Sequence, residues 1–226
     1  MQLPTPPASN MTTRILAIRH GETPWNRERR YQGQEDVPLN EAGLAQARSI
    51  AAALAGTAID AIYTSDLARA TQTAAELAQV RAMPMLVDSD LREQHFGVFQ
   101  GLTGEEIAQR WPEASASWHR READFGPSGG ETRNAFSQRC VQAIERIALT
   151  HEGKTIAIVC HGGVLDCLYR AAARLPMDIS RTWSLDNAAI SHLVHGTDGF
   201  AILDWGNTQH LPRAPADELV EHFPAP

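Results

Sequence analysis

Short apolar runs alternate with segments of helical periodicity along most of this chain. The apolar runs predict buried strands at 14–18, 59–63, 85–87, 155–160, 189–194 and 200–205. Apolar residues that recur every three or four positions predict helices at 44–54, 67–77, 136–147 and 164–175. Because strands alternate with helices, we expect an α/β fold of three layers, with a mostly parallel sheet flanked by helices.

The domain organisation follows from length and local composition. The 226 residues fit one domain, and we expect it to span 14–226. Two tryptophans among charged residues at 102–121 predict short helices, which would form a small helical cap insertion at about 94–153. Residues 1–13 hold three prolines and no periodic pattern, so they are predicted to be a flexible leader.

Composition excludes several classes of protein. The net charge of −7 argues against a nucleic-acid partner, because proteins that bind nucleic acids present a basic face. No apolar run approaches the roughly 20 residues that a membrane helix needs, so no membrane partner is expected. The three cysteines lack metal-ligand spacing, and the first residues do not resemble a secretory signal. A cytoplasmic location is therefore the expectation.

Two of the predicted strands end in histidine loops. Arg19-His20-Gly21-Glu22-Thr23 follows the first strand, and His161-Gly162-Gly163 follows the strongest one. In open parallel sheets, ligands bind beyond the carboxyl ends of the strands. Taken alone, the first string could be a surface loop and the second an ordinary helix start. The equivalent positions of the two strings after their strands favour a shared anion site.

Arg69 and Glu93 also follow predicted strands. In the first turn of its helix, Arg69 would add its charge to the positive end of that helix, which favours an anion. All but one of the 20 basic residues are arginine, which grips phosphate with two donors at once. Taken alone, however, Arg69 is equally a helix-surface residue and Glu93 an ordinary loop carboxylate.

Blocks spread over most of the chain resemble the histidine phosphatase (phosphoglycerate mutase-like) superfamily. In order they are Arg19-His20-Gly21-Glu22-Thr23, Trp25-Asn26, Gln32-Gly33, Pro38-Leu39-Asn40-Glu41-Ala42-Gly43, Ser65-Asp66-Leu67 with Arg69-Ala70 and Thr73, Leu91-Arg92-Glu93 with Phe96-Gly97 and Gly101, Gly129-Gly130-Glu131, and His161-Gly162-Gly163. The resemblance runs from about Arg14 to Trp205.

The resemblance implies a role for each of the candidate residues. His20 would be the nucleophile that is transiently phosphorylated, and Glu93 the proton donor. Arg19, Arg69 and His161 would hold the phosphoryl group, with Asn26 as a further polar contact. Two arginines and a protonated His161 would offset the phosphate charge, so we expect no metal and no cofactor.

Three functions remain within this resemblance. A phosphatase acting on small phosphomonoesters is favoured, with a cofactor-dependent phosphoglycerate mutase and a non-catalytic phosphate-binding homologue as alternatives. Mutases carry arginine after the acid and asparagine after the histidine-glycine pair, where this chain has Gln94 and Gly163. The string Trp118-His119-Arg120-Arg121 faintly resembles a basic pair of mutases. The expected partner is a small-molecule phosphate ester, and a homodimer is a common state of such a fold.

Overall fold

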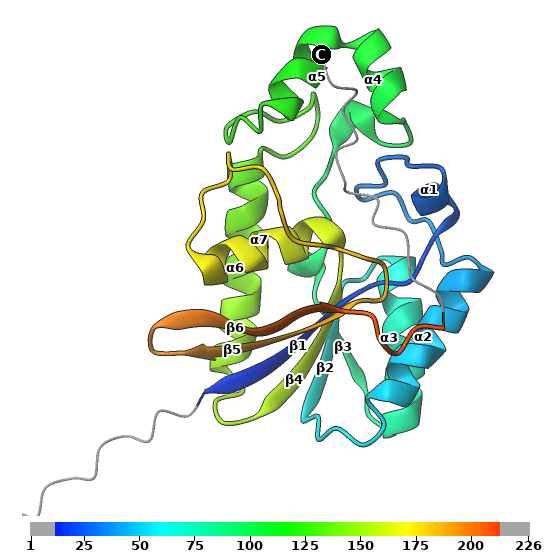
Figure 1. Ribbon diagram of the computed structural model, residues 1–226, viewed down its shortest axis with the longest axis vertical. Coiled ribbons are helices and arrows are strands. Elements are labelled where there is room, and N and C mark those ends of the chain that lie inside the picture. The colour runs from blue at the N-terminus through cyan, green and yellow to red at the C-terminus, as the bar shows by residue number, and fades with distance from the viewer. Residues whose placement is uncertain (1–11, 213–226) are drawn as a thin grey trace, which may run out of the picture.

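A computed structural model gives the fold and describes residues 12–212. A six-stranded sheet lies at its centre, in the order β3-β2-β4-β1-β5-β6 (Figure 1). The strands are β1 (Thr13–Arg19), β2 (Ala61–Thr64), β3 (Met85–Val87), β4 (Thr155–Cys160), β5 (Ile190–Gly196) and β6 (Gly199–Asn207). The first four in chain order run parallel, and β5 and β6 add an antiparallel hairpin next to β1.

The helices of the described residues are α1 (Pro24–Arg27), α2 (Glu41–Ala53), α3 (Ala68–Arg81), α4 (Gly104–Arg110), α5 (Pro112–His119), α6 (Arg133–Leu149) and α7 (Gly162–Ala173), with short 3-10 turns η1 (Ser89–Leu91) and η2 (Gly97–Phe99). Four of them cover the two faces of the sheet. Figure 1 shows α2 and α3 on one side of the sheet and α6 and α7 on the other. The predicted three-layer α/β fold is confirmed.

The two core clusters follow from the alternation of side chains along each strand. In β1, Ile15 and Ala17 pack with the buried residues of α6 and α7, whereas Leu16 and Ile18 pack with those of α2 and α3. The buried strand β4 alternates in the same way. Because successive side chains of a strand point to opposite faces, one apolar run supplies both sides of a buried sheet.

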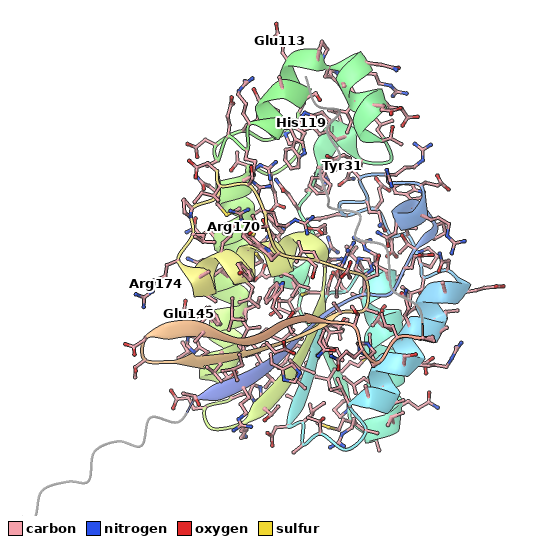
Figure 2. All side chains as sticks on the ribbon, viewed as in Figure 1. Tyr31, Glu113, His119, Glu145, Arg170 and Arg174 are labelled. Carbon is pink, nitrogen blue, oxygen red and sulfur yellow. The ribbon has the colours of Figure 1, made fainter. Side chains whose placement is uncertain are left out.

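A third cluster lies outside the layers and holds the cap together. It is built from Phe99, Ile107 and Trp118, with Tyr31 packed against them. The indole nitrogen of Trp118 donates to the Tyr31 hydroxyl at 3.0 Å, so the loop after α1 is tied to α5. Figure 2 labels Tyr31 below the cap helices. The range 94–153 also contains α6, whose buried residues belong to the sheet layers.

The sequence pattern differs from the structure in a few places. The helix predicted at 67–77 begins at Ala68 and continues to Arg81, and the short helix α1 was not predicted. Thr13, counted with the leader, is the buried first residue of β1, and its hydroxyl donates to the Ala148 carbonyl at 2.7 Å. Residues 1–11 of the expected leader lie outside the described residues. None of the helices within 12–212 is long and apolar enough to cross a membrane.

Candidate active site

His20 and His161 stand side by side at the carboxyl edge of the sheet. They follow β1 and β4, which are adjacent and parallel, with Arg19 paired to Cys160 in the register. The ring centroids of the two histidines are 5.2 Å apart, and both side chains are buried. The strand register therefore brings together two loops that are about 140 residues apart in the sequence, as the sequence pattern predicted.

The hydrogen bond of His20 fixes which ring nitrogen carries the proton. Nδ1 lies 2.7 Å from the carbonyl oxygen of Gly21, an atom that can only accept, so Nδ1 carries the proton. Burial lowers the pKa of His20 well below its ordinary value, and the charges of Arg69 and Arg19 lower it further. The ring is therefore neutral near pH 7, and Nε2 presents an unprotonated lone pair.

His161 has the opposite tautomer. Its Nδ1 accepts a hydrogen bond from Nε of Arg69 at 3.2 Å, so the proton of the neutral ring is on Nε2. Burial, with the charge of Arg69 next in size, lowers the pKa of His161 well below its ordinary value. The expected protonated His161 is thus not what this environment favours in the free protein. Its Nε2 has no hydrogen-bond partner among the described residues and is a neutral donor at the site.

Arg69 is held rigidly at the start of α3. One guanidinium nitrogen donates to the Glu35 carbonyl at 2.8 Å and the other to the Gly33 carbonyl at 2.7 Å. Burial lowers its pKa to about 10, so it still carries its charge near pH 7. The side chain of Thr73 links this helix to the histidine loop, because its hydroxyl accepts from the amide of Gly21 at 3.0 Å.

Arg19 is the last residue of β1 and is buried with His20. Its guanidinium donates to the carbonyl of Leu185. The charge of Arg19 lowers the pKa of both His20 and His161, so it acts within the same cluster. The structure therefore groups the two predicted arginines around the pair of histidines.

Glu93 reaches the same cluster from the loop after η1. Its carboxylate accepts from the amide of Gly163 at 2.9 Å and from that of Gln94 at 2.8 Å. Burial raises its pKa above the ordinary value, against the smaller lowering by these two bonds and by Arg69 and Arg19. A Cβ on Gly163 would lie 2.2 Å from the carboxylate, so a side chain at this position would push the carboxylate away.

Asn26 lies beside the cluster as part of the cap of α1. Its amide oxygen accepts from the backbone amide of Thr23 at 2.8 Å and from the side chain of Asn187 at 3.3 Å. Asn187, which the sequence analysis missed, also donates to the carbonyls of His20 and Gly21 at 3.2 and 3.4 Å. It lies in a loop without periodicity, so no local pattern marked it.

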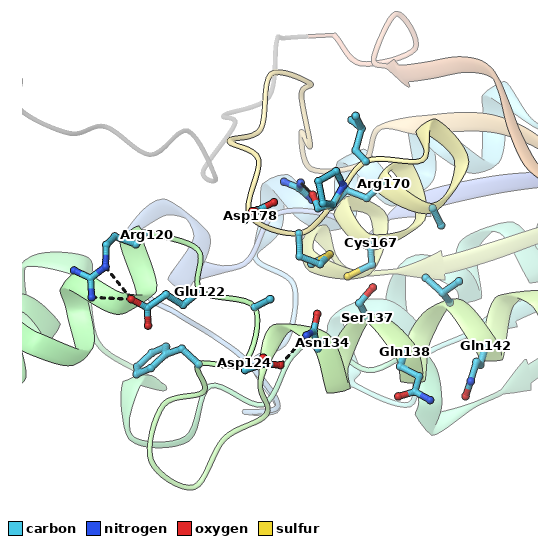
Figure 3. A pocket seen from close by; sticks show the side chains of 17 residues that line it. Arg120, Glu122, Asp124, Asn134, Ser137, Gln138, Gln142, Cys167, Arg170 and Asp178 are labelled. Atoms are coloured by element: carbon cyan, nitrogen blue, oxygen red, sulfur yellow. Dashed lines mark hydrogen bonds and ion pairs between the residues drawn. The ribbon is translucent and has the colours of Figure 1, made fainter.

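A groove lies elsewhere on the described surface. This outer groove, of about 1310 Å³, runs between α6, α7 and the segment after α5, and its lining contains none of the predicted site residues (Figure 3). Nor do the described residues contain a group of three or more histidine, cysteine, aspartate or glutamate side chains placed to hold a metal ion.

Comparison with known proteins identifies the family of this chain. The sequence pattern of the histidine phosphatase superfamily (branch 1) matches residues 15–208. Phosphoglycerate mutase-like protein 4 of Arabidopsis thaliana is 38% identical over 200 residues, covering 87% of this chain and 86% of the relative. Metal-independent phosphoserine phosphatase of the same plant is 38% identical over 203 residues, covering 88% and 83%.

A solved structure is also similar to this chain. YhfR of Bacillus stearothermophilus superposes with a TM-score of 0.81 at 34% identity, over 88% of this chain and 98% of that one. The family pattern spans most of the chain, and both histidine loops, Arg69 and Glu93 lie within it. The chain therefore belongs to branch 1 of the histidine phosphatase superfamily.

Proposed function

We propose that this protein hydrolyses small phosphate monoesters through a phosphohistidine at His20. The observation that carries the proposal is the pair of opposite tautomers. His20 turns an unprotonated Nε2 to the site, whereas the buried Nε2 of His161 is a donor. Together with the charges of Arg19 and Arg69, this arrangement combines a nucleophile with donors for phosphoryl oxygens.

The first half-reaction forms the phosphoenzyme. The lone pair on Nε2 of His20 attacks phosphorus in line with the leaving oxygen, and the P–O bond to the alcohol breaks. Glu93, whose raised pKa favours the protonated form, gives its proton to that oxygen. Arg19, Arg69, His161 and Asn26 would hold the equatorial oxygens, and the two fixed arginine charges offset the negative charge that they carry.

The second half-reaction returns the enzyme to its starting state. Glu93, now ionised, takes a proton from water as the water oxygen attacks the phosphorus. The P–N bond to His20 breaks, and inorganic phosphate leaves. One carboxyl group thus serves as acid and then as base, and it starts the next cycle protonated. Glu22 is a weaker candidate for the acid, because its carboxylate is paired with Arg27 at 2.6 Å and accepts from Asn40 at 2.7 Å.

The mutase is the second candidate, since one relative is named mutase-like. The contacts of the two cap arginines speak against it. Arg120 pairs with Glu122 at 2.7 Å at the outer groove (Figure 3), and Arg121 is buried against Asp166 at 3.3 Å. The side chain of Gln94, at the position where mutases carry arginine, donates to the carbonyl of Glu131 at 2.9 Å. These side chains are engaged within the protein, which favours hydrolysis over return of the phosphate to a bound intermediate.

Rapid quench with labelled substrate tests the proposal. Mixing the protein with a ³²P-labelled ester and quenching in alkali should trap an acid-labile phosphoenzyme within one turnover. A panel of esters, with phosphoserine first because of the relative named above, would then identify the substrate. Isomerisation of 3-phosphoglycerate in the presence of the bisphosphate cofactor is measured alongside. Isomerisation faster than hydrolysis would favour the mutase, and no labelled protein during turnover would overturn the phosphohistidine.

A further inference from the structure

Arg139 on α6 contacts the backbone of the loop that carries Glu93. One terminal nitrogen of its guanidinium donates to the carbonyls of Asp90 and Arg92 at 2.9 and 3.1 Å, and the other donates to the carbonyl of Glu93 at 3.3 Å. Three backbone carbonyls in and before the proposed acid are thus bound by one side chain. Arg139 borders the apolar stripe of α6, so its backbone is fixed by a helix that is packed on the sheet.

Glu131 completes the contact from the other side. Its carboxylate pairs with Arg139 through two bonds of 2.8 Å and also accepts from the amide of His95 at 2.8 Å. The backbone of Glu131 bonds the same loop, because its carbonyl accepts from the side chain of Gln94 and its amide donates to the carbonyl of His95. The residues on both sides of Glu93 are therefore fixed.

The glycines before Glu131 allow this close approach. A Cβ on Gly130 would lie 2.5 Å from the carbonyl oxygen of His95 and 2.9 Å from the amide of Gly97. Backbone meets backbone here, so no flexible side chain could move aside. The string Gly129-Gly130-Glu131, which the family resemblance included without a role, thus forms one wall of the loop that presents the acid.

We infer that Glu131 and Arg139 are positioning residues that hold the carboxyl group of Glu93 in reach of the leaving oxygen. The inference rests on the proposed function, and it adds residues that do not themselves touch the substrate. Among the described residues, the Glu93 carboxylate accepts hydrogen bonds from two backbone amides, so the path of the backbone decides where the proton is delivered. A displacement of about 1 Å at such a group can cost a factor of about 10² in rate.

Arg146 provides a matched control on the same helix. It lies two helical turns beyond Arg139, and its ion pairs reach Asp88 and Asp90 at 2.6 and 3.4 Å, at the start of the same loop. Its side chain is 56% exposed, whereas that of Arg139 is 20% exposed. A general effect of losing one α6 arginine would appear in both variants.

The test compares kcat/KM for an alkyl phosphate with kcat/KM for p-nitrophenyl phosphate. This parameter covers the steps up to phosphorylation of the enzyme, and only the alkyl ester needs the proton at that stage. Arg139→Gln should lose about tenfold or more with the alkyl ester and much less with p-nitrophenyl phosphate. Glu131→Gln should show the same selective loss, Arg139→Lys a smaller one, and Arg146→Gln none.

Thermal unfolding of each variant separates positioning from folding. Equal losses on both esters in folded Arg139→Gln and Glu131→Gln would overturn the inference, as would a selective loss in Arg146→Gln. If Arg139→Gln does not fold, Glu131→Gln and Arg139→Lys decide the question by the same ratio. The proposed function is judged separately by the rapid-quench experiment on the wild-type protein, because it fails if no labelled phosphoenzyme forms during turnover, whatever the Arg139 and Glu131 variants do.

Discussion

The two concave or reactive regions of this protein differ in how their polar groups are used. In the outer groove between α6, α7 and the cap, most polar side chains bond within the protein: Arg120 pairs with Glu122, and Asn134 donates to Asp124. Arg170 also lines this groove, and although one of its guanidinium nitrogens has no partner among the described residues, its Nε is paired with Asp166 at 2.9 Å. At the sheet edge, two buried histidines face two arginines, and the Nε2 donor of His161 has no partner among the described residues. What distinguishes the sheet edge is this combination of a buried donor, a second histidine and two cations, and such a cluster indicates a ligand site better than hollow volume does.

The largest expected effect separates the two regions directly. His20→Ala removes the proposed nucleophile and should lower kcat/KM on the order of 10⁴-fold or more. Arg120→Ala, in the outer groove, should change it less than about twofold, because it removes only an exposed ion pair. Steady-state hydrolysis of p-nitrophenyl phosphate measures both. Near-normal activity of folded His20→Ala would remove the basis for placing the chemistry at the sheet edge.

Replacing the acid should have the next largest effect. Glu93→Gln keeps the size of the side chain but has no transferable proton, so an alkyl phosphate should react about a hundredfold more slowly or worse. p-Nitrophenolate leaves without a proton, so phosphorylation by that ester should slow much less. Dephosphorylation still needs the base, and stopped-flow mixing should show a burst of p-nitrophenolate. Equal slowing of both esters without a burst would mean that Glu93 only supports the loop.

A methyl group added beside the acid should have a smaller effect. In Gly163→Ala the new Cβ would lie 2.2 Å from the Glu93 carboxylate, which must move away. We expect kcat/KM for an alkyl phosphate to fall about tenfold. Gly104→Ala in the cap is the control, because nothing lies within 4 Å of its added Cβ. Unchanged kinetics in Gly163→Ala would show that the carboxylate position is not critical.

On each side of its pH profile, kcat/KM should change about tenfold per pH unit. A protonated His20 ring cannot attack, so kcat/KM should fall as the pH drops through the pKa of His20. Because that pKa is lowered, this fall should lie below pH 6.5, the ordinary pKa of histidine. The raised pKa of Glu93 places the basic limb above its ordinary value of 4.5, since activity falls as that group loses its proton. The ester's own ionisation is common to all proteins compared. The ratio of kcat/KM for the wild type to kcat/KM for Glu93→Gln should therefore fall as pH rises through the pKa of Glu93. A ratio that does not change with pH would contradict the role of Glu93 as the acid.

Metal removal should have the smallest effect. Arg19, Arg69 and His161 would supply the donors that offset the phosphate charge, so the rate should stay within about 20% after dialysis against a chelator. Hydrolysis before and after dialysis, with magnesium or zinc added back, measures this. A loss that either ion restores would mean that the charge at the sheet edge is neutralised in another way.

Local sequence determined the elements and the positions of the reactive side chains. The apolar runs of β1 and β4 and the helical periodicity of α6 and α7 depend on residues near one another in the chain, so their pattern could be recognised. The histidines that end β1 and β4 could then be placed at one edge of the sheet by topology alone. Their roles came from the family resemblance and stay proposals.

Tertiary structure decided what no local pattern could. The register of β1 and β4 brings the two rings together, and the Gly21 carbonyl and Arg69 assign them opposite tautomers. Burial lowers the pKa of His161 and so favours its neutral form in the free protein, whereas a protonated ring was expected with phosphate bound. Asn187 and Arg139 contact loops that are distant in the sequence. Proton positions and pKa values depend on desolvation and on neighbours a few ångströms away in space, and these exist only once the chain has packed.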